Sequence, residues 1–182
     1  AYHFLEVTRK HDIQPLIGLE MTLIIDEKAI SFRFLALSTK GYQELMKLST
    51  LKMTGRNNWS DFTSHLEDVA VIVPYFNGVE QMDLGHDYFI GVSPDTPQEV
   101  FTKPILPLYL VNSFSKEDLQ VLQILSAIKD NVSLREVDVH SQQGIFLPAS
   151  ELEARFENSF PQALANLQDL IKNVSYQIDP SL

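Results

Sequence analysis

Three ionisable side chains lie close together in the sequence, at Asp83, His86 and Asp87. Two carboxylates and an imidazole could bind a cation or act as an acid–base pair. A metal or catalytic centre usually draws its groups from more than one segment of the chain, and no second ligand-bearing segment accompanies this one. The interpretation that we favour is a polar loop with solvated side chains.

The other histidines are isolated by their spacing. His3 and His11 lie eight residues apart on a predicted helix, whereas imidazoles meet on a helix surface at a spacing of three or four residues. We interpret both as surface residues. His65 and His140 have no companion that would help them bind a metal or move a proton, so neither predicts a site.

The motifs of several common chemistries are missing. No Gly-x-Ser-x-Gly turn presents a serine nucleophile, and neither Gly-x-Gly-x-x-Gly nor a phosphate-binding Gly-Lys-Ser/Thr loop occurs. The chain has no cysteine, which excludes a disulfide framework, a thiolate zinc site and a cysteine nucleophile. The lack of cysteine also fits a cytoplasmic location.

The charge of the chain bears on its partners. Acidic residues outnumber basic ones by 24 to 14, and the formal net charge is −10. Autonomous DNA binding is not expected, because proteins that grip DNA cluster lysines and arginines. Trp59 flanks the basic loop 55–58 and is a candidate contact for DNA or a partner, whereas Phe32 and Phe34 are assigned to the core. No apolar run reaches the ~18 to 20 residues that span a bilayer, so no membrane contact is expected.

Alternating strands and helices must position these residues. Apolar runs and helical periodicity predict strands at 16–25, 29–37, 69–73, 88–92 and 104–111, and helices up to His11, at 40–53, 61–66, 116–129 and 151–156, and from Pro161. A helical turn is expected at 98–101. Such alternation favours an α/β fold with a mostly parallel sheet.

Helix starts carry capping signals. Ser115 with Asp118 resembles a capping box, and Ser60 and Ser150 are expected to cap the helices that follow them. The helix at 116–129 is expected to turn a row of apolar residues toward the core: Leu119, Leu122, Leu125 and Ile128.

Two motifs resemble a known family. The strand Pro15-Leu16-Ile17-Gly18-Leu19-Glu20 is followed at 41–49 by a helix that opens with Gly-Tyr and ends with Leu-Ser. This pair of motifs, with its spacing, resembles the polymerase-and-histidinol-phosphatase (PHP) domain of bacterial replicative DNA polymerases, the DNA polymerase III alpha subunits. The resemblance covers nearly the whole chain and points to the shorter, low-G+C Gram-positive type.

The resemblance implies a distorted barrel of alternating strands and helices. Residues 1–145 would form this PHP barrel, incomplete at its N-terminus, and residues 146–182 a C-terminal helical extension toward the polymerase core. We expect the chain to be a piece of a longer protein. We also expect uncovered sheet edges to pair between copies.

The resemblance also implies a metal site that has been dismantled. Active family members bind metal ions through histidines and carboxylates at strand ends and so generate a hydroxide that attacks phosphorus. Glu20 matches the family's strand-end glutamate; it is either a vestigial metal ligand or a partly buried structural carboxylate with hydrogen-bond partners. The family's Cys or His falls near Tyr75, and its Asp-x-His near Leu110, Val111 and Asn112. A leucine has no lone pair, and a neutral phenol is a poor ligand for a hard cation.

The function implied is that of one segment of a DNA-directed DNA polymerase. The segment itself would hold no catalytic residue and no cofactor, and Mg²⁺ would act in a separate polymerase domain. Its partners would be the rest of the polymerase chain and replisome subunits, with primer–template DNA contacted through other domains. Two alternatives stay open: an active metal-dependent PHP phosphoesterase or exonuclease that uses Glu20 and Asn112, and an α/β binding module with accidental similarity.

Overall fold

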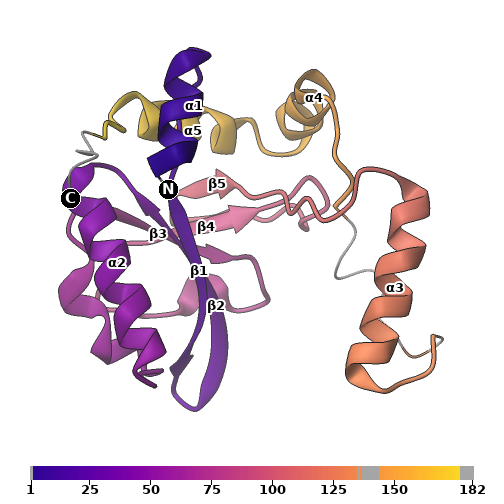
Figure 1. Ribbon diagram of the computed structural model, residues 1–182, viewed down its shortest axis with the longest axis horizontal. Helices are drawn as coiled ribbons and strands as arrows, with labels where there is room; N and C mark the ends of the chain where they lie inside the picture. The colour runs from indigo at the N-terminus through magenta and orange to yellow at the C-terminus, as the bar shows by residue number, and fades with distance from the viewer. Residues whose placement is uncertain (1, 135, 137–143, 177–182) are drawn as a thin grey trace.

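The computed structural model describes residues 2–134, 136 and 144–176, and a five-stranded sheet forms its centre (Figure 1). The strands lie side by side in chain order. They are β1 (Gly18–Ile25), β2 (Lys28–Ala36), β3 (Val69–Pro74), β4 (Phe89–Val92) and β5 (Ile105–Pro107). Every strand lies where the apolar runs predicted one, although β2 begins one residue before its predicted range and β3 ends one residue after it.

The expectation of a mostly parallel sheet is wrong for half of the strand pairs. β1 pairs with β2 and β2 with β3 in antiparallel fashion, whereas the pairs β3–β4 and β4–β5 are parallel. For the pair β1–β2 the reason lies in the first turn, where Asp26 and Glu27 both have positive φ, 47° and 64°. A two-residue turn of this kind folds the chain straight back into a hairpin. The sheet formed by the described strands is open rather than closed into a barrel.

The described residues also form five α-helices and three 3₁₀ turns. The helices are α1 (Tyr2–Lys10), α2 (Thr39–Met53), α3 (Lys116–Asp130), α4 (Ala149–Ser159) and α5 (Pro161–Lys172), and the turns are η1 (Trp59–Asp61), η2 (Thr63–His65) and η3 (Val79–Gln81). None of these helices is both long and apolar enough to cross a membrane.

Three local predictions need correction. The segment 61–66 forms 3₁₀ turns instead of one helix capped by Ser60, and 98–101 is not helical. Ser150 lies inside α4, which begins one residue earlier after Pro148, so its side chain does not cap the helix. The capping box of Ser115 and Asp118 at the start of α3 is confirmed.

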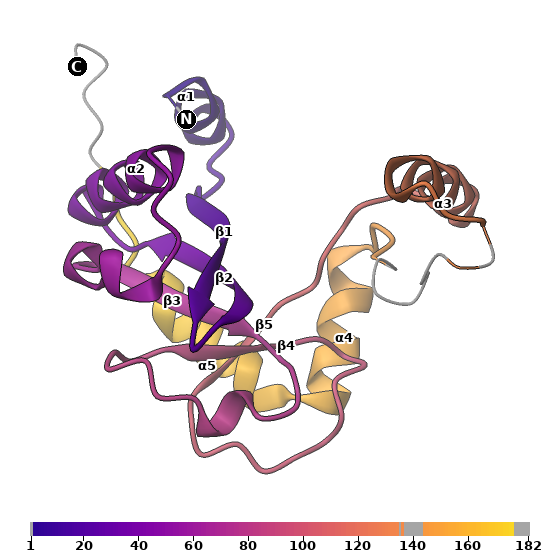
Figure 2. The ribbon, with the colours of Figure 1, turned by 90° about the horizontal axis from the view of Figure 1, so that it is seen from below.

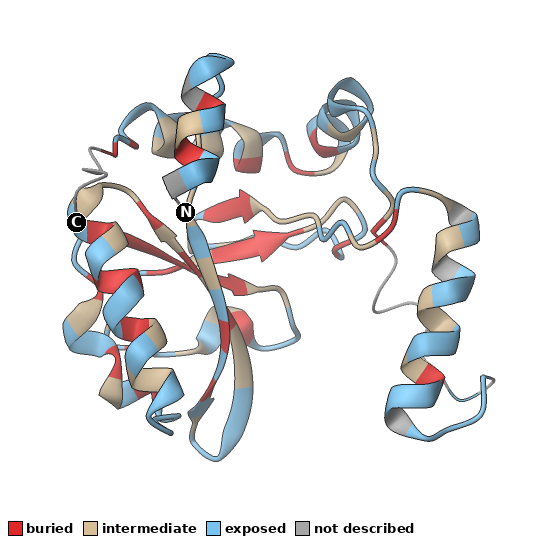
Figure 3. Cartoon of the chain, viewed as in Figure 1, coloured by how far each residue is buried: buried red, intermediate tan, exposed pale blue. Residues whose placement is uncertain are grey.

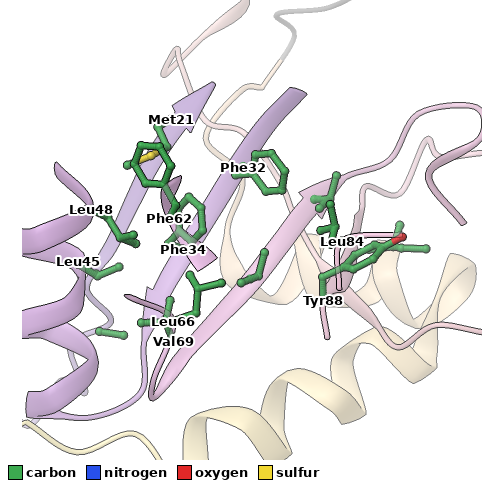
Figure 4. Close-up of a cluster of buried hydrophobic side chains, with 14 of the residues drawn as sticks. Met21, Phe32, Phe34, Leu45, Leu48, Phe62, Leu66, Val69, Leu84 and Tyr88 are labelled. Carbon is green, nitrogen blue, oxygen red and sulfur yellow. The ribbon is translucent and has the colours of Figure 1, made fainter. Parts of the chain in front are cut away.

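The main core lies between α2 and the first three strands (Figure 4). Leu45 and Leu48 of α2 are buried there together with Phe62, which is fully buried after η1. Phe32 and Phe34 of β2 point into the same cluster. Buried residues concentrate on the sheet and on the side of α2 that faces it, as Figure 3 shows.

The far side of the sheet is covered by α5, which lies opposite α2 in Figure 2. Ala163 is fully buried against β5, and the side-chain amide of Asn166 donates to the carbonyl of Ile105 at 2.9 Å. After α5 the chain returns to the end of β2, where the hydroxyl of Tyr176 donates to the carbonyl of Ala36 at 2.6 Å. The segment assigned to a C-terminal extension thus packs on the same sheet.

α3 departs from its prediction more than any other helix. It stands away from the sheet and from the other helices (Figures 1 and 2). Leu125 and Ile128, expected to face the core, are 55% and 71% exposed. Leu122 is half-buried, and the side chain of Leu119 lies outside what the structure describes. The prediction of an inward apolar face is therefore wrong for Leu125 and Ile128.

Candidate functional site

Glu20 is the third residue of β1 and lies directly opposite Arg33 of β2. Its Oε1 atom is 3.0 Å from Nη2 of Arg33, and the glutamate side chain is 59% exposed. Arg33 is held in turn by the hydroxyl of Ser31, to which its Nη1 donates at 2.7 Å. The expected partner of the carboxylate is therefore present. The expected burial and strand-end position are not.

Position 75, where the family places a Cys or His, carries a phenol that is already engaged. The Tyr75 hydroxyl donates to Oε1 of Glu99 at 2.5 Å, and its ring meets Phe101 edge-on at 6.1 Å between centroids. The hydrogen bond to Glu99, together with burial, raises the pKa of Tyr75 above its ordinary value. The phenol thus stays protonated at neutral pH, the form that binds hard cations poorly.

Positions 110 to 112, where the family places Asp-x-His, serve the backbone instead. The side-chain oxygen of Asn112 accepts from the backbone N–H of Gly144 at 3.3 Å, and the backbone N–H of Asn112 donates to the carbonyl of Gly144 at 2.9 Å. Leu110 is 53% exposed and offers only hydrocarbon. Asn112 therefore joins two distant chain segments.

The described structure does not bring these positions together. Glu20 lies on β1, at one edge of the sheet, and Asn112 follows β5, at the other edge. Four strand spacings of about 4.8 Å each separate the two edge strands. No group of three His, Asp or Glu side chains placed to hold a metal ion occurs among the described residues. A metal contact of Glu20 stays a prediction.

The loop cluster at 83–87 uses its polar atoms locally. Oδ1 of Asp83 accepts from the amide of Gly85 at 2.9 Å, and Nδ1 of His86 lies 2.7 Å from the carbonyl of Asp87. A carbonyl can only accept, so the imidazole donates through Nδ1. Asp87 is exposed. These contacts support the interpretation of a polar loop.

Of the other histidines, one has a partner that the sequence did not indicate. Nδ1 of His65 is 3.0 Å from Oε2 of Glu44, a buried carboxylate on α2. Oε1 of Glu44 accepts from Lys47 at 2.8 Å. His3 and His11 are exposed as expected, and His140 lies outside the described residues.

These contacts keep Glu44 ionised. The hydrogen bond from Lys47 lowers the pKa of Glu44, burial opposes this shift, and the hydrogen bond from His65 adds to the lowering. Lys47 follows Glu44 by three residues on the same helix, a spacing that could have indicated an ion pair. The contact with His65 crosses 21 positions of sequence and had no such signal. The group fixes η2 against α2.

Trp59 is not an exposed contact for DNA. It is 7% exposed, and its ring stacks on Phe32 with centroids 4.9 Å apart. The indole N–H donates to the carbonyl of Leu84 at 2.9 Å. The prediction of a surface role is therefore wrong, because the basic loop that precedes Trp59 turns the ring inward over β2.

A second, half-buried carboxylate anchors the loop before β5. Oε1 of Glu80 accepts from the amide of Thr102, from the amide of Lys103 and from the hydroxyl of Thr102. Burial alone would raise the pKa of Glu80, but these hydrogen bonds outweigh it and hold the pKa below its ordinary value. The arrangement fastens η3 to the loop and leaves no opening for a ligand at Oε1.

Comparison with known proteins gives one consistent match. No protein-family model matches the chain. DNA polymerase III subunit alpha of Streptococcus pyogenes serotype M1 is 35% identical over 184 residues, which cover 100% of this chain and 18% of that protein. The protein of the same name from Halalkalibacterium halodurans is 22% identical over 206 residues, covering 93% of this chain and 18% of that protein. The chain thus spans about a fifth of the length of these relatives and is homologous, along its whole length, to one segment of DNA polymerase III subunit alpha.

Proposed function

We propose that residues 1–182 form the PHP-type segment of a bacterial DNA polymerase III alpha subunit of the shorter, low-G+C Gram-positive type. The whole protein is a DNA-directed DNA polymerase that adds deoxynucleotides to a primer, with Mg²⁺ bound in a separate polymerase domain. The similarity of the entire chain to the streptococcal protein supports this assignment. An accidental similarity does not account for a match of this extent.

The segment acts as architecture and not as a second active site. The observation that carries this proposal is the chemistry at the expected ligand positions. Tyr75 holds its proton and binds Glu99, while Asn112 binds the backbone of Gly144. Glu20 is the one residue that keeps the type of a ligand, and it is paired with Arg33. We infer that Glu20 is vestigial and that no cofactor acts in this segment.

We infer that the fold around the expected metal-ligand positions has been retained although the ligands have been lost. In the full protein, the open sheet described above is part of a distorted PHP barrel whose other strands lie outside residues 1–182. The barrel supports the polymerase chain and offers a docking surface to replisome subunits, while primer–template DNA is contacted by other domains. A replicative polymerase of this kind works in the cytoplasm. The net charge of −10 fits a segment that does not grip DNA by itself.

An active phosphoesterase is the competing function, and no observation favours it. It requires Glu20 and Asn112 to bind the same metal ion, although Glu20 lies on one edge strand of the described sheet and Asn112 follows the other edge strand. A metal-bound hydroxide also needs several ligands that converge on one point. The described residues provide no such convergence.

The full-length polymerase provides the test. With primer–template DNA, Mg²⁺ and deoxynucleotides, it should extend the primer. With Mn²⁺ or Zn²⁺ and no deoxynucleotides, nucleotide release from the primer should be the same for the wild type, Glu20→Ala and the control Glu157→Ala, an exposed glutamate on α4. Nucleotide release that Glu20→Ala abolishes and Glu157→Ala keeps would establish the phosphoesterase. Failure to extend the primer would contradict the polymerase assignment.

A further inference from the structure

α3 belongs to an arm, defined here as residues 109–134 and 144–146, that leaves the body after β5 and returns before α4 (Figure 1). The base of the arm is closed by hydrogen bonds between its two ends. The amide of Phe146 donates to the carbonyl of Ser113 at 2.8 Å, and the hydroxyl of Tyr109 donates to the carbonyl of Ile145 at 3.0 Å. A Cβ on Gly144 would lie 1.2 Å from the carbonyl oxygen of Leu110, so the two ends touch. The arm therefore projects from a closed base.

The helix on this arm is well formed at both ends. Its start has the reciprocal capping box of Ser115 and Asp118, and its end has Asn131 in the left-handed conformation with φ 51°. These are local signals that stop and start a helix without help from tertiary packing. The helical form of α3 is thus determined by its own sequence.

The outer face of α3 carries an apolar stripe. Its members recur at the spacing i, i+3, i+4 and i+7, and they are Val121, Ile124, Leu125 and Ile128, which are 55%, 46%, 55% and 71% exposed. This is the spacing by which one helix face enters an apolar groove on a partner. A contiguous exposed apolar patch on a protein surface often marks an interaction site.

The size of the stripe bears on what covers it. Four side chains from one helix present on the order of a few hundred Å², less than the roughly 800 Å² that each of two separate proteins typically buries in a stable complex. A surface this small can nevertheless dock firmly when both partners belong to one chain, because covalent linkage gives a high effective concentration. Most of the length of the streptococcal relative lies outside the matched segment.

We propose that the α3 stripe docks into an apolar groove on another part of the same polymerase polypeptide, outside residues 1–182, and so fixes this segment relative to the polymerase domains. This inference rests on the proposed function, since it needs the longer chain. The docked helix would act through its apolar face. The closed base at Gly144 would set its direction.

Thiol labelling of the full-length polymerase tests the docking. Residues 1–182 contain no cysteine, so a single substitution provides a unique thiol in this segment. Ile124→Cys is compared with Val100→Cys, a matched apolar residue that is 94% exposed on a loop. Each native labelling rate is divided by the rate of the same peptide in denaturant, with labelled peptides identified by mass spectrometry.

Folding should slow the labelling of Ile124→Cys at least about tenfold relative to denaturant, and that of Val100→Cys less than about threefold. Dilution of the protein should change neither ratio. Equal reactivity of the two positions would overturn the proposal. So would protection that disappears on dilution, because a second copy or a separate protein would then be the occupant.

Photo-crosslinking then identifies the contact. With p-benzoylphenylalanine in place of Ile128, the crosslinked peptides should map outside residues 1–182 of the same chain. Crosslinks confined to residues 1–182 would contradict the inference. Neither readout depends on polymerase or nuclease activity, so its failure would leave the proposed function standing.

Discussion

The Nδ1 atom of His65 lies 3.0 Å from Oε2 of Glu44, a buried residue that is 3% exposed. Because Lys47 occupies the other carboxylate oxygen, both oxygens of Glu44 have a donor. A buried charge is tolerated only with such partners. The pair joins α2 to η2, two elements that are separated by the nine residues 54–62. This contact shows how ionisable groups help to hold the α/β body in shape.

Replacement of Glu44 should make the protein less stable at neutral pH. Glu44→Gln loses a carboxylate that accepts two charge-assisted or polar hydrogen bonds, and we expect the free energy of unfolding to fall by about 1 to 3 kcal/mol at pH 7. The pKa of Glu44 is lowered in the folded state. The ionised carboxylate therefore contributes its full stabilisation at pH values above its ordinary pKa of 4.5. This stabilisation is lost as the pH falls through the lower pKa of the folded state.

Urea unfolding from pH 3 to pH 7 checks this prediction. The difference between wild type and Glu44→Gln should shrink toward acid pH. Glu67→Gln is the control, because the Glu67 side chain is 72% exposed and its ion pair with Lys40, at 3.6 Å, lies at the surface. Its loss should therefore lower the free energy of unfolding by less than about 0.5 kcal/mol. An equal cost for both variants would show that burial of Glu44 does not matter.

Trp59 should behave as a core residue. Trp59→Ala removes a ring stacked on Phe32 and should cost about 3 to 5 kcal/mol of unfolding free energy. Trp59 is the single tryptophan of the chain, so segment 1–182 contributes one fluorescence signal. Its emission should be blue-shifted and poorly quenched by acrylamide. Strong quenching that DNA relieves would restore the surface role that the sequence had suggested.

Gly41 should tolerate no side chain. A Cβ at this position would lie 2.1 Å from the carbonyl oxygen of Asp68, which accepts from the amide of Leu37 at 2.9 Å. Gly41→Ala should therefore lower the free energy of unfolding by about 1 to 3 kcal/mol, although alanine is the better helix former. Gln43→Ala, at an exposed position of α2, should stay within about 0.5 kcal/mol of wild type. Chemical unfolding measures both, and a stabilised Gly41→Ala would show that α2 can shift away from Asp68.

Tyr88 should limit stability at alkaline pH. Its hydroxyl donates to the carbonyls of Val79 and Met82 at 2.7 and 2.8 Å, and burial, with the charges of Glu80 and Asp83, raises its pKa to about 12. A phenol with a raised pKa contributes stability below its ordinary value of 10 that is lost as the pH rises toward the folded value.

The alkaline range separates the Tyr88 variant from its control. Between pH 10 and pH 12, Tyr88→Phe should lose less stability than wild type, whereas the control Gln43→Ala, which changes no ionisable group, should lose as much as wild type. Unfolding midpoints in urea at several alkaline pH values measure this. Parallel curves for wild type and Tyr88→Phe would mean that ionisation of this phenol plays no part.

Most features that depend on local sequence were predicted correctly, whereas features that depend on contacts between distant residues were not. Apolar runs located all five described strands, and the Ser115–Asp118 capping box located the start of α3, because these signals are local. The direction of β1 and β2 depended on the conformations of Asp26 and Glu27, which are residue types that also occur in longer connections. The burial of Trp59 depended on a contact with β2, which no local pattern encodes.

The candidate site could be predicted only by resemblance to a family. Glu20 was identified by its motif, but its pairing with Arg33 depends on the register of the hairpin. The contact of His65 with Glu44 spans 21 residues and requires α2 and η2 to pack first. Apolar periodicity in α3 was correctly found, but periodicity alone does not say whether the apolar face meets the core of its own fold or a surface elsewhere.

Metal stoichiometry of the full-length polymerase tests the central claim most directly. Calorimetric titration with Mn²⁺ should give the same number of bound ions for wild type, Glu20→Ala and Glu157→Ala, because the ions belong to the polymerase domain and none to the segment described here. Loss of one or more bound ions in Glu20→Ala, with full binding retained in Glu157→Ala, would contradict the account and restore Glu20 as a working metal ligand.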